Sequence, residues 1–167
     1  MRAPGNAGST SLNRFRKRSI IYRSGINMKH TVKATLNTEE KRTIKTERAP
    51  EAIGAYIQGV DLGSLIITSG QLPIDAKTNT IADDIAAQTR QSLENVAAVV
   101  EKAGLSVADI VKTTVFVKDL NEFVTMNTAY RLFFEEHQAP FPARSCVEVA
   151  RLPKDVKIEI EAIAVRR

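Results

Sequence analysis

Cysteine and histidine are both scarce in this chain of 167 residues. It has one cysteine, Cys146, and two histidines that lie far apart in sequence, His30 and His137. A single cysteine excludes an intramolecular disulfide and fits a reducing compartment, so we expect a cytoplasmic protein. Without a Cys/His cluster at metal-ligand spacing, we expect no zinc or iron site.

Phosphate-binding loops and long apolar runs are also missing. The chain has no Gly-rich loop of the G-x-x-x-x-G-K or G-x-G-x-x-G form, so nothing supports a nucleotide cofactor. No apolar run approaches the roughly 20 residues that a membrane-spanning helix needs. Hydrophobic residues nevertheless make up 43% of the chain, which predicts a globular domain with a packed core.

Acidic residues are nearly absent from the beginning of the chain. Residues 1–40 hold 8 Lys and Arg against 2 Asp and Glu, whereas residues 41–167 hold 16 against 17. The net charge of +5 therefore divides into +6 for the front segment and −1 for the remainder. A remainder this close to neutral argues against a nucleic-acid-binding domain, which usually presents a basic surface.

The front segment, residues 1–40, shows no helix or strand period. An Arg-rich, Ser-rich and acid-poor start is typical of organellar transit peptides, which would place the protein in an organelle. A basic arm for RNA or an anionic membrane is a second interpretation. We favour a third one, a disordered tail or upstream sequence ahead of a start at Met28. The expected division is thus an extension, residues 1–40, and a folded domain, residues 41–167.

The first half of that domain alternates between strand and helix patterns. Residues 55–62 and 64–72 predict two strands of a hairpin. Residues 82–103 carry apolar side chains at spacings of three and four, which predicts a long helix with one buried stripe. Residues 110–117 are rich in β-branched side chains and predict a buried strand.

The second half predicts another helix and two more strands. Asp119 and Glu122 fit a capping box at the start of the helix. The pattern of residues 141–165 predicts two strands joined at residues 152–155. The order ββαβαββ predicts an α+β fold, a mixed β-sheet with both helices packed on one face. Because the last strand carries apolar residues on both faces, we expect the second face to be buried in an oligomer.

Three polar residues stand out on the last two predicted strands, which we expect to be neighbours. Alternation places Arg144 and Cys146 on one face of the first strand, about 6.6 Å apart. Glu159 and Glu161 share a face of the second. A sheet rarely holds a charge among apolar side chains unless that charge is paired or used, so these positions indicate a functional site.

Each of these residues also has a structural explanation. Arg144 could hold a substrate carboxylate through two parallel hydrogen bonds, or it could pair with Glu148 or Glu159. Cys146 would need a base to lower its pKa before it could act as a nucleophile, so we favour a pocket-lining role. Glu159 could activate a water molecule, or it could be a solvated carboxylate on an edge strand.

Three other polar side chains are candidates for ligand contacts. Tyr56 and Ser69 lie near the ends of the predicted hairpin strands, where a hydroxyl could face a ligand or could simply pack. Asn127 lies among apolar neighbours on the second helix, a position that also suits an internal hydrogen bond. The sequence pattern alone leaves these roles open.

Several of these stretches resemble the reactive intermediate deaminase (Rid, or YjgF) family. The resemblance covers roughly residues 43–167, and residues 1–40 have no counterpart in it. Its most specific part is the run ARSCVEVARLPKD within FPARSCVEVARLPKDVKIEIEAIAV, accompanied by AIGAYIQGVDLG, IITSGQLP, QSLENV and DIVKTTVFVKDLN. The resemblance implies a chorismate-mutase-like α+β fold and a homotrimer with clefts between its subunits.

The resemblance also implies an activity and a set of site residues. The activity is hydrolysis of 2-imino acids, such as 2-iminobutanoate and 2-iminopropanoate, to 2-keto acids and ammonia, without a metal or organic cofactor. Arg144 would bind the substrate carboxylate, Glu159 would hold the attacking water, and Cys146 would line the pocket near the imine. Three further positions match residues that line the cleft: Tyr56, Ser69 and Asn127.

Two other functions compete with this interpretation. The same cleft could bind small 2-keto acids or other carboxylates as a non-catalytic module or sensor. RNA cleavage is the third possibility, and the near-neutral charge of residues 41–167 argues against it.

Overall fold

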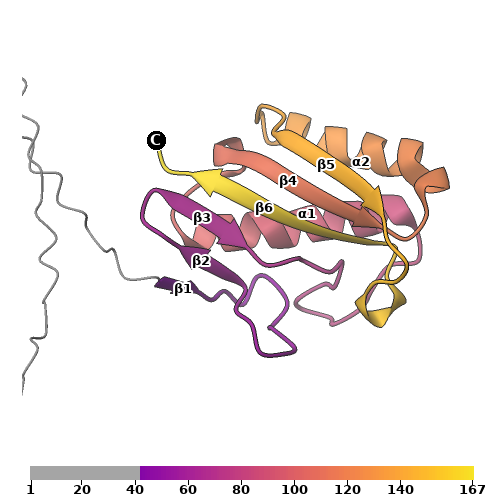
Figure 1. Ribbon diagram of the computed structural model, residues 1–167, viewed down its shortest axis with the longest axis horizontal. Helices are drawn as coiled ribbons and strands as arrows, with labels where there is room; N and C mark the ends of the chain where they lie inside the picture. The colour runs from indigo at the N-terminus through magenta and orange to yellow at the C-terminus, as the bar shows by residue number, and fades with distance from the viewer. Residues whose placement is uncertain (1–41) are drawn as a thin grey trace, which may run out of the picture. The chain divides into compact units, whose positions relative to one another are not determined.

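A six-stranded mixed sheet with two helices against one face makes up residues 42–167, the part of the chain that the computed structural model describes (Figure 1). The expectations for residues 1–40, and for His30, lie outside it. The strand order is β1-β2-β3-β6-β4-β5, and every neighbouring pair is antiparallel except β4 and β5. The strands are β1 (Arg42–Ile44), β2 (Gly59–Asp61), β3 (Leu65–Thr68), β4 (Ile110–Val117), β5 (Ala143–Glu148) and β6 (Ile158–Val165).

The predicted α+β class and the packing of both helices on one face are confirmed. The predicted order ββαβαββ is also correct except for β1, an additional strand at the edge of the sheet beside β2. Of the three residues in β1 only Ile44 is buried, so the strand has no readable period and depends on its pairing with β2. Among the described residues no helix is both long and apolar enough to span a membrane.

Helix α1 (Ile85–Lys102) lies within the predicted range of residues 82–103 but begins three residues later than predicted, at Ile85. The carboxylate of Asp84 accepts a hydrogen bond of 2.8 Å from the Ala87 N–H, which caps the first turn. Gly104 follows the helix with a φ of +80°, a left-handed conformation that suits glycine and ends the helix.

Helix α2 (Phe123–Glu136) begins differently from the prediction. Asp119 accepts a hydrogen bond from Asn121 N–H and thereby caps a short 3-10 turn, Leu120–Glu122, that precedes the helix. The predicted capping box of α2 is therefore wrong. The extra turn lets the chain change direction between β4 and α2, and the helix then returns along the sheet to allow a parallel pairing of β4 with β5.

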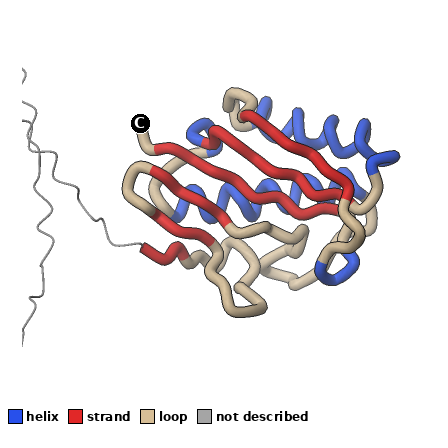
Figure 2. Tube along the Cα trace, in the orientation of Figure 1, coloured by secondary structure: helices blue, strands red, loops and turns tan. Residues whose placement is uncertain are grey.

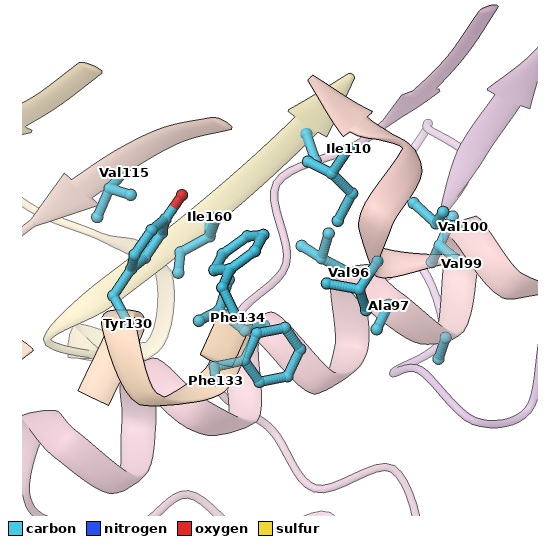
Figure 3. Close-up of a cluster of buried hydrophobic side chains, with 14 of the residues drawn as sticks. Val96, Ala97, Val99, Val100, Ile110, Val115, Tyr130, Phe133, Phe134 and Ile160 are labelled. Carbon is cyan, nitrogen blue, oxygen red and sulfur yellow. The ribbon is translucent and has the colours of Figure 1, made fainter. Parts of the chain in front are cut away.

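The core lies between the helices and the sheet. Figure 3 shows Val96 and Val100 of α1, Phe133 and Phe134 of α2 and Ile160 of β6 in this layer, and all five are fully buried. On β6 the buried residues alternate with half-buried ones that point to the opposite, open face: Glu159, Glu161, Ile163 and Val165. The last strand thus carries apolar residues on both faces, as predicted.

Candidate active site

The register of the sheet places Arg144 and Glu159 on opposite faces. On β4, Thr113 pairs with Arg144 of β5 and with Ala162 of β6, whereas Phe116 pairs with Glu159 of β6. Paired residues in a sheet share a face. Thr113 is fully buried under the helices, so Arg144 lies on the helix face and Glu159 lies on the open face.

The expectation that the two final strands are neighbours is therefore wrong, because β4 lies between β5 and β6. The predicted pairing of Arg144 with Cys146 on one face agrees with this register, since Cys146 also packs against the helix-side core. Within one chain the guanidinium and the Glu159 carboxylate belong to two separate half-sites.

The first half-site is a hollow of about 370 Å³ lined by Asn127, Tyr130 and Arg144, with Arg131, Phe141 and Pro142. An Arg144 Nη2 donates a hydrogen bond of 2.7 Å to Asn127 Oδ1, and the Arg144 Cζ lies 4.5 Å from the centre of the Tyr130 ring. Neither Glu148 nor Glu159 pairs with Arg144, and no other carboxylate does so within residues 42–167. This side chain thus has an unneutralised charge facing a hollow.

Cys146 lies beside Arg144 on β5, half-buried and without another cysteine to pair with. Burial raises the pKa of the Cys146 thiol, and the positive charge of Arg144 offsets only part of that rise. The thiol is therefore protonated near neutral pH, which suits a pocket-lining role better than nucleophilic attack.

The second half-site is a hollow of about 420 Å³ on the open face, lined by Tyr56, Ser69, Gly70 and Glu159, with Ile53, Leu72, Pro153 and Glu161. The Glu159 carboxylate makes no hydrogen bond or ion pair with any residue in the described range. Burial raises its pKa, and the nearby charge of Glu161 raises it further. An unpaired carboxylate with a raised pKa has the properties of a general base.

Gly70 is a site residue that sequence reasoning missed. A Cβ at this position would lie only 1.9 Å from Glu159 Oε1, so the carboxylate occupies the space that a side chain at position 70 would fill. The glycine between Ser69 and Gln71 is visible in the sequence, but its contact with a residue of β6 is decided by tertiary packing. The absence of a side chain at Gly70 is what lets Glu159 lie in the hollow.

Tyr56 and Ser69 both line this second half-site, but neither lies on a strand. The predicted strand at residues 55–62 is wrong at its start, because β2 begins at Gly59 and Tyr56 lies in the preceding loop (tan in Figure 2). The buried Gln58 amide holds that loop by donating to the carbonyls of Thr46, Ala49 and Pro50.

The hydroxyls of these two residues differ in how free they are. The Tyr56 hydroxyl accepts one long hydrogen bond of 3.3 Å from Ile53 N–H, and the residue is 47% exposed. The Ser69 hydroxyl, after β3, donates to the Ile57 carbonyl in the loop before β2, so its proton is already used in a contact within the protein. Tyr56 is therefore better placed than Ser69 to donate to a ligand.

Comparison with known proteins finds close relatives over most of the chain. Residues 46–166 match the family model described as Endoribonuclease L-PSP. The 2-iminobutanoate/2-iminopropanoate deaminase of Salmonella typhimurium is 74% identical over 126 residues, which are 75% of this chain and 98% of that protein. The protein of the same name from Escherichia coli K12 is 72% identical over 126 residues, again 75% of this chain and 98% of that protein.

Solved structures agree with this likeness. The crystal structure of the YjgF gene product of E. coli is 71% identical, with a TM-score of 0.75, and the match covers 75% of this chain and 99% of that one. The crystal structure of E. coli TdcF with bound serine is 63% identical, with a TM-score of 0.75, and covers 76% of this chain and all of that one.

Proposed function

The chain belongs to the Endoribonuclease L-PSP family, also called Rid or YjgF, and from this premise we propose how its half-sites act on 2-imino acids. The protein is a 2-iminobutanoate/2-iminopropanoate deaminase, a hydrolase that converts reactive 2-imino acids to 2-keto acids and ammonia. No metal or organic cofactor is part of the proposal. Residues 42–167 contain no cluster of three or more His, Cys, Asp or Glu that could hold a metal ion.

Arg144 is the substrate anchor in this proposal. An imino acid carries a carboxylate, and a guanidinium can bind it through two parallel charge-assisted hydrogen bonds. The single observation that supports this most strongly is the unneutralised Arg144 facing a hollow. A half-buried cation is costly unless an anion joins it, so the hollow favours an anionic ligand.

Glu159 holds and activates the attacking water. Its carboxylate takes a proton from the water as the water oxygen adds to the carbon of the protonated imine, which gives a carbinolamine. Glu159 then passes that proton to the nitrogen. The carbon–nitrogen bond breaks and ammonia leaves. Glu159 takes the proton of the hydroxyl, which gives the 2-keto acid, and passes that proton to the departing ammonia, so the carboxylate is restored. Positioning of the two reactants and proton transfer supply the catalysis, and a well-placed base typically contributes about 10²–10⁴-fold.

A complete site requires two subunits, because one chain holds Arg144 and Glu159 on opposite faces of the sheet. We propose a homotrimer in which the Arg144 half-site of one subunit meets the Glu159 half-site of the next, which gives three clefts. Ile67 and Ile163 lie on the open face, where a neighbouring subunit would bury them. Tyr56, Ser69 and Gly70 would reach the substrate with Glu159, and Asn127 and Cys146 with Arg144.

A coupled assay tests the proposal directly. Threonine dehydratase generates 2-iminobutanoate in the presence of the purified full chain, and the appearance of 2-ketobutanoate is followed. We expect the chain to accelerate this appearance. A chain that binds 2-ketobutanoate without accelerating it would instead be a sensor, and cleavage of a generic RNA under the same conditions would support a nuclease. We propose the cytoplasm as the compartment, which fractionation of cells would test.

Replacing Gly70 with alanine is expected to lower kcat by about 10- to 100-fold, because the new Cβ displaces the Glu159 carboxylate from the water. The displaced atoms are the end of a flexible side chain, so the melting temperature should change little. Gly54→Ala is the matched control, since its Cβ would meet only the Tyr56 ring at an ordinary 3.5 Å. Wild-type kcat in Gly70→Ala would contradict the placement of Glu159.

The activity should fall at acidic pH as Glu159 takes up a proton. Because burial and the charge of Glu161 raise the pKa of Glu159, the acid limb of kcat/KM should lie above pH 4.5, the ordinary value. Glu161→Gln removes the repelling charge, so the pKa of Glu159 should fall and the limb should move to lower pH. Profiles measured with excess dehydratase at every pH check this. Glu94→Gln, on the surface of α1, should leave the limb in place.

A further inference from the structure

The guanidinium of Arg144 is held only by uncharged groups. Asn127 Oδ1 accepts one hydrogen bond, the Tyr130 ring lies 4.5 Å from Cζ, and the Phe123 ring lies 5.8 Å from it. A carboxylate in any of these places would hold the arginine equally well but would neutralise it. Aromatic faces attract the cation through their quadrupole and leave its net charge available to a ligand.

One hydrogen bond cannot fix the plane of a guanidinium, because the group can still rotate about its contact with Asn127. A bidentate carboxylate contact requires that plane to be fixed in advance. The Tyr130 ring is the closer of the two aromatic contacts, and it also lines the hollow that Arg144 faces. The ring therefore limits how the guanidinium can turn.

The Tyr130 side chain is held by a hydrogen bond to its hydroxyl and by packing against its ring. Its hydroxyl shares a hydrogen bond of 2.7 Å with the Thr113 hydroxyl, and the two residues are 4% and 0% exposed. The Phe134 ring packs against the Tyr130 ring at a centroid distance of 5.0 Å. Figure 3 shows the Tyr130 ring extending from α2 toward Val115 and Ile160 of the sheet. Thr113 of β4 is also the residue that pairs with Arg144 of β5 in the sheet. The residue that holds the Tyr130 hydroxyl is therefore a direct neighbour of Arg144.

We propose that Tyr130 is a positioning residue for imine hydrolysis, whose ring, fixed by Thr113, orients the Arg144 guanidinium to receive the substrate carboxylate. The hydroxyl does not touch the substrate in this role, since Thr113 already occupies it. This inference rests on the proposed function of Arg144 as the carboxylate anchor. It assigns the ring and the hydroxyl separate tasks: the ring acts on the arginine, and the hydroxyl acts on the ring.

Two substitutions separate these tasks. Tyr130→Leu removes the ring and is expected to raise both the KM for 2-iminobutanoate and the Kd for 2-ketobutanoate by about 3- to 30-fold. Tyr130→Phe keeps the ring but frees it from Thr113, so both values should rise only about threefold, and the melting temperature should fall because the Thr113 hydroxyl loses its partner. If Tyr130 were only a core residue, binding would follow the loss of stability, and the two variants would not differ in this way.

Controls separate a failure of this inference from a failure of the proposed function. Phe133 is a fully buried residue of α2. Phe133→Leu should therefore lower the melting temperature without changing the Kd for 2-ketobutanoate. If the Arg144→Ala variant binds 2-ketobutanoate as tightly as wild type, the role of Arg144 as the carboxylate anchor is wrong. If Arg144→Ala weakens binding and Tyr130→Leu does not, the positioning role alone is wrong. The role is also wrong if Tyr130→Leu weakens binding as much in the Arg144→Ala background as in wild type.

Thr113→Val provides a second route should Tyr130→Leu fail to fold. It frees the tyrosine hydroxyl and keeps the ring, so the guanidinium would rest on a less rigid surface. The Kd for 2-ketobutanoate is then expected to rise about threefold, near the lower end of the range for losing the ring contact. An unchanged Kd in a folded Thr113→Val protein would contradict the fixing role of Thr113.

Discussion

Arg144→Ala is expected to lower kcat/KM for 2-iminobutanoate by about 10²- to 10³-fold, since truncating one partner of a buried charge pair costs about 2–5 kcal/mol. The fold should survive, because within the described residues the guanidinium contacts only Asn127 and two aromatic rings. The coupled dehydratase assay measures the loss, and circular dichroism checks the fold. Activity close to wild type would reject the anchoring role.

Graded substitutions make that result specific. Arg144→Lys keeps the charge but not the two-pronged geometry, so it should recover only part of the loss. Arg131→Ala removes a cation from the same hollow, but Glu135 already pairs with that cation at 2.7 Å, so the loss should be smaller than for Arg144→Ala. Cys146→Ala should also lose less activity than Arg144→Ala, because the protonated thiol only lines the pocket. Complete loss in Cys146→Ala, with covalent adducts in the native protein, would instead identify a nucleophile.

Mixed oligomers of two inactive variants are expected to regain activity. In Arg144→Ala the Glu159 half-site is intact, and in Glu159→Gln the Arg144 half-site is intact. If each cleft takes one half-site from each of two subunits, random assembly at equal amounts gives roughly a quarter of the clefts both intact halves. Co-expression with two different tags, followed by tandem purification, would isolate the mixed oligomers for the coupled assay.

The outcome distinguishes shared clefts from a site within one chain. A site built in a single chain would stay inactive, since every subunit carries one lesion. Arg144→Ala mixed with Arg144→Gln is the matched control, because both lesions fall in the same half-site and no intact cleft can form. Recovery in the first mixture alone would also establish that the chain assembles in solution, and sedimentation or light scattering would then show whether three subunits are present.

Local signals in the sequence were sufficient for several elements of the fold. Helix α1 needs only its apolar stripe, the Asp84 cap and Gly104, all of which act over a few residues. Strand β4 was predicted at residues 110–117 because β-branched side chains there favour a strand whatever its partners. The alternation that joins Arg144 and Cys146 on one face is equally local, since side chains in any strand point to alternate faces.

Tertiary structure alone decided how the candidate site is divided. Strand β4 lies between β5 and β6, and the register of these pairings puts Arg144 and Glu159 on opposite faces. No spacing in the sequence states which strands become neighbours or in which register they pair. The fit of Gly70 to the Glu159 carboxylate and the Tyr130 hydrogen bond to Thr113 likewise join residues distant in sequence. The spacing of apolar residues along a segment indicates which of its faces is buried. Which residue it contacts across the sheet, or between a helix and the sheet, depends on which packing of the whole domain has the lowest free energy.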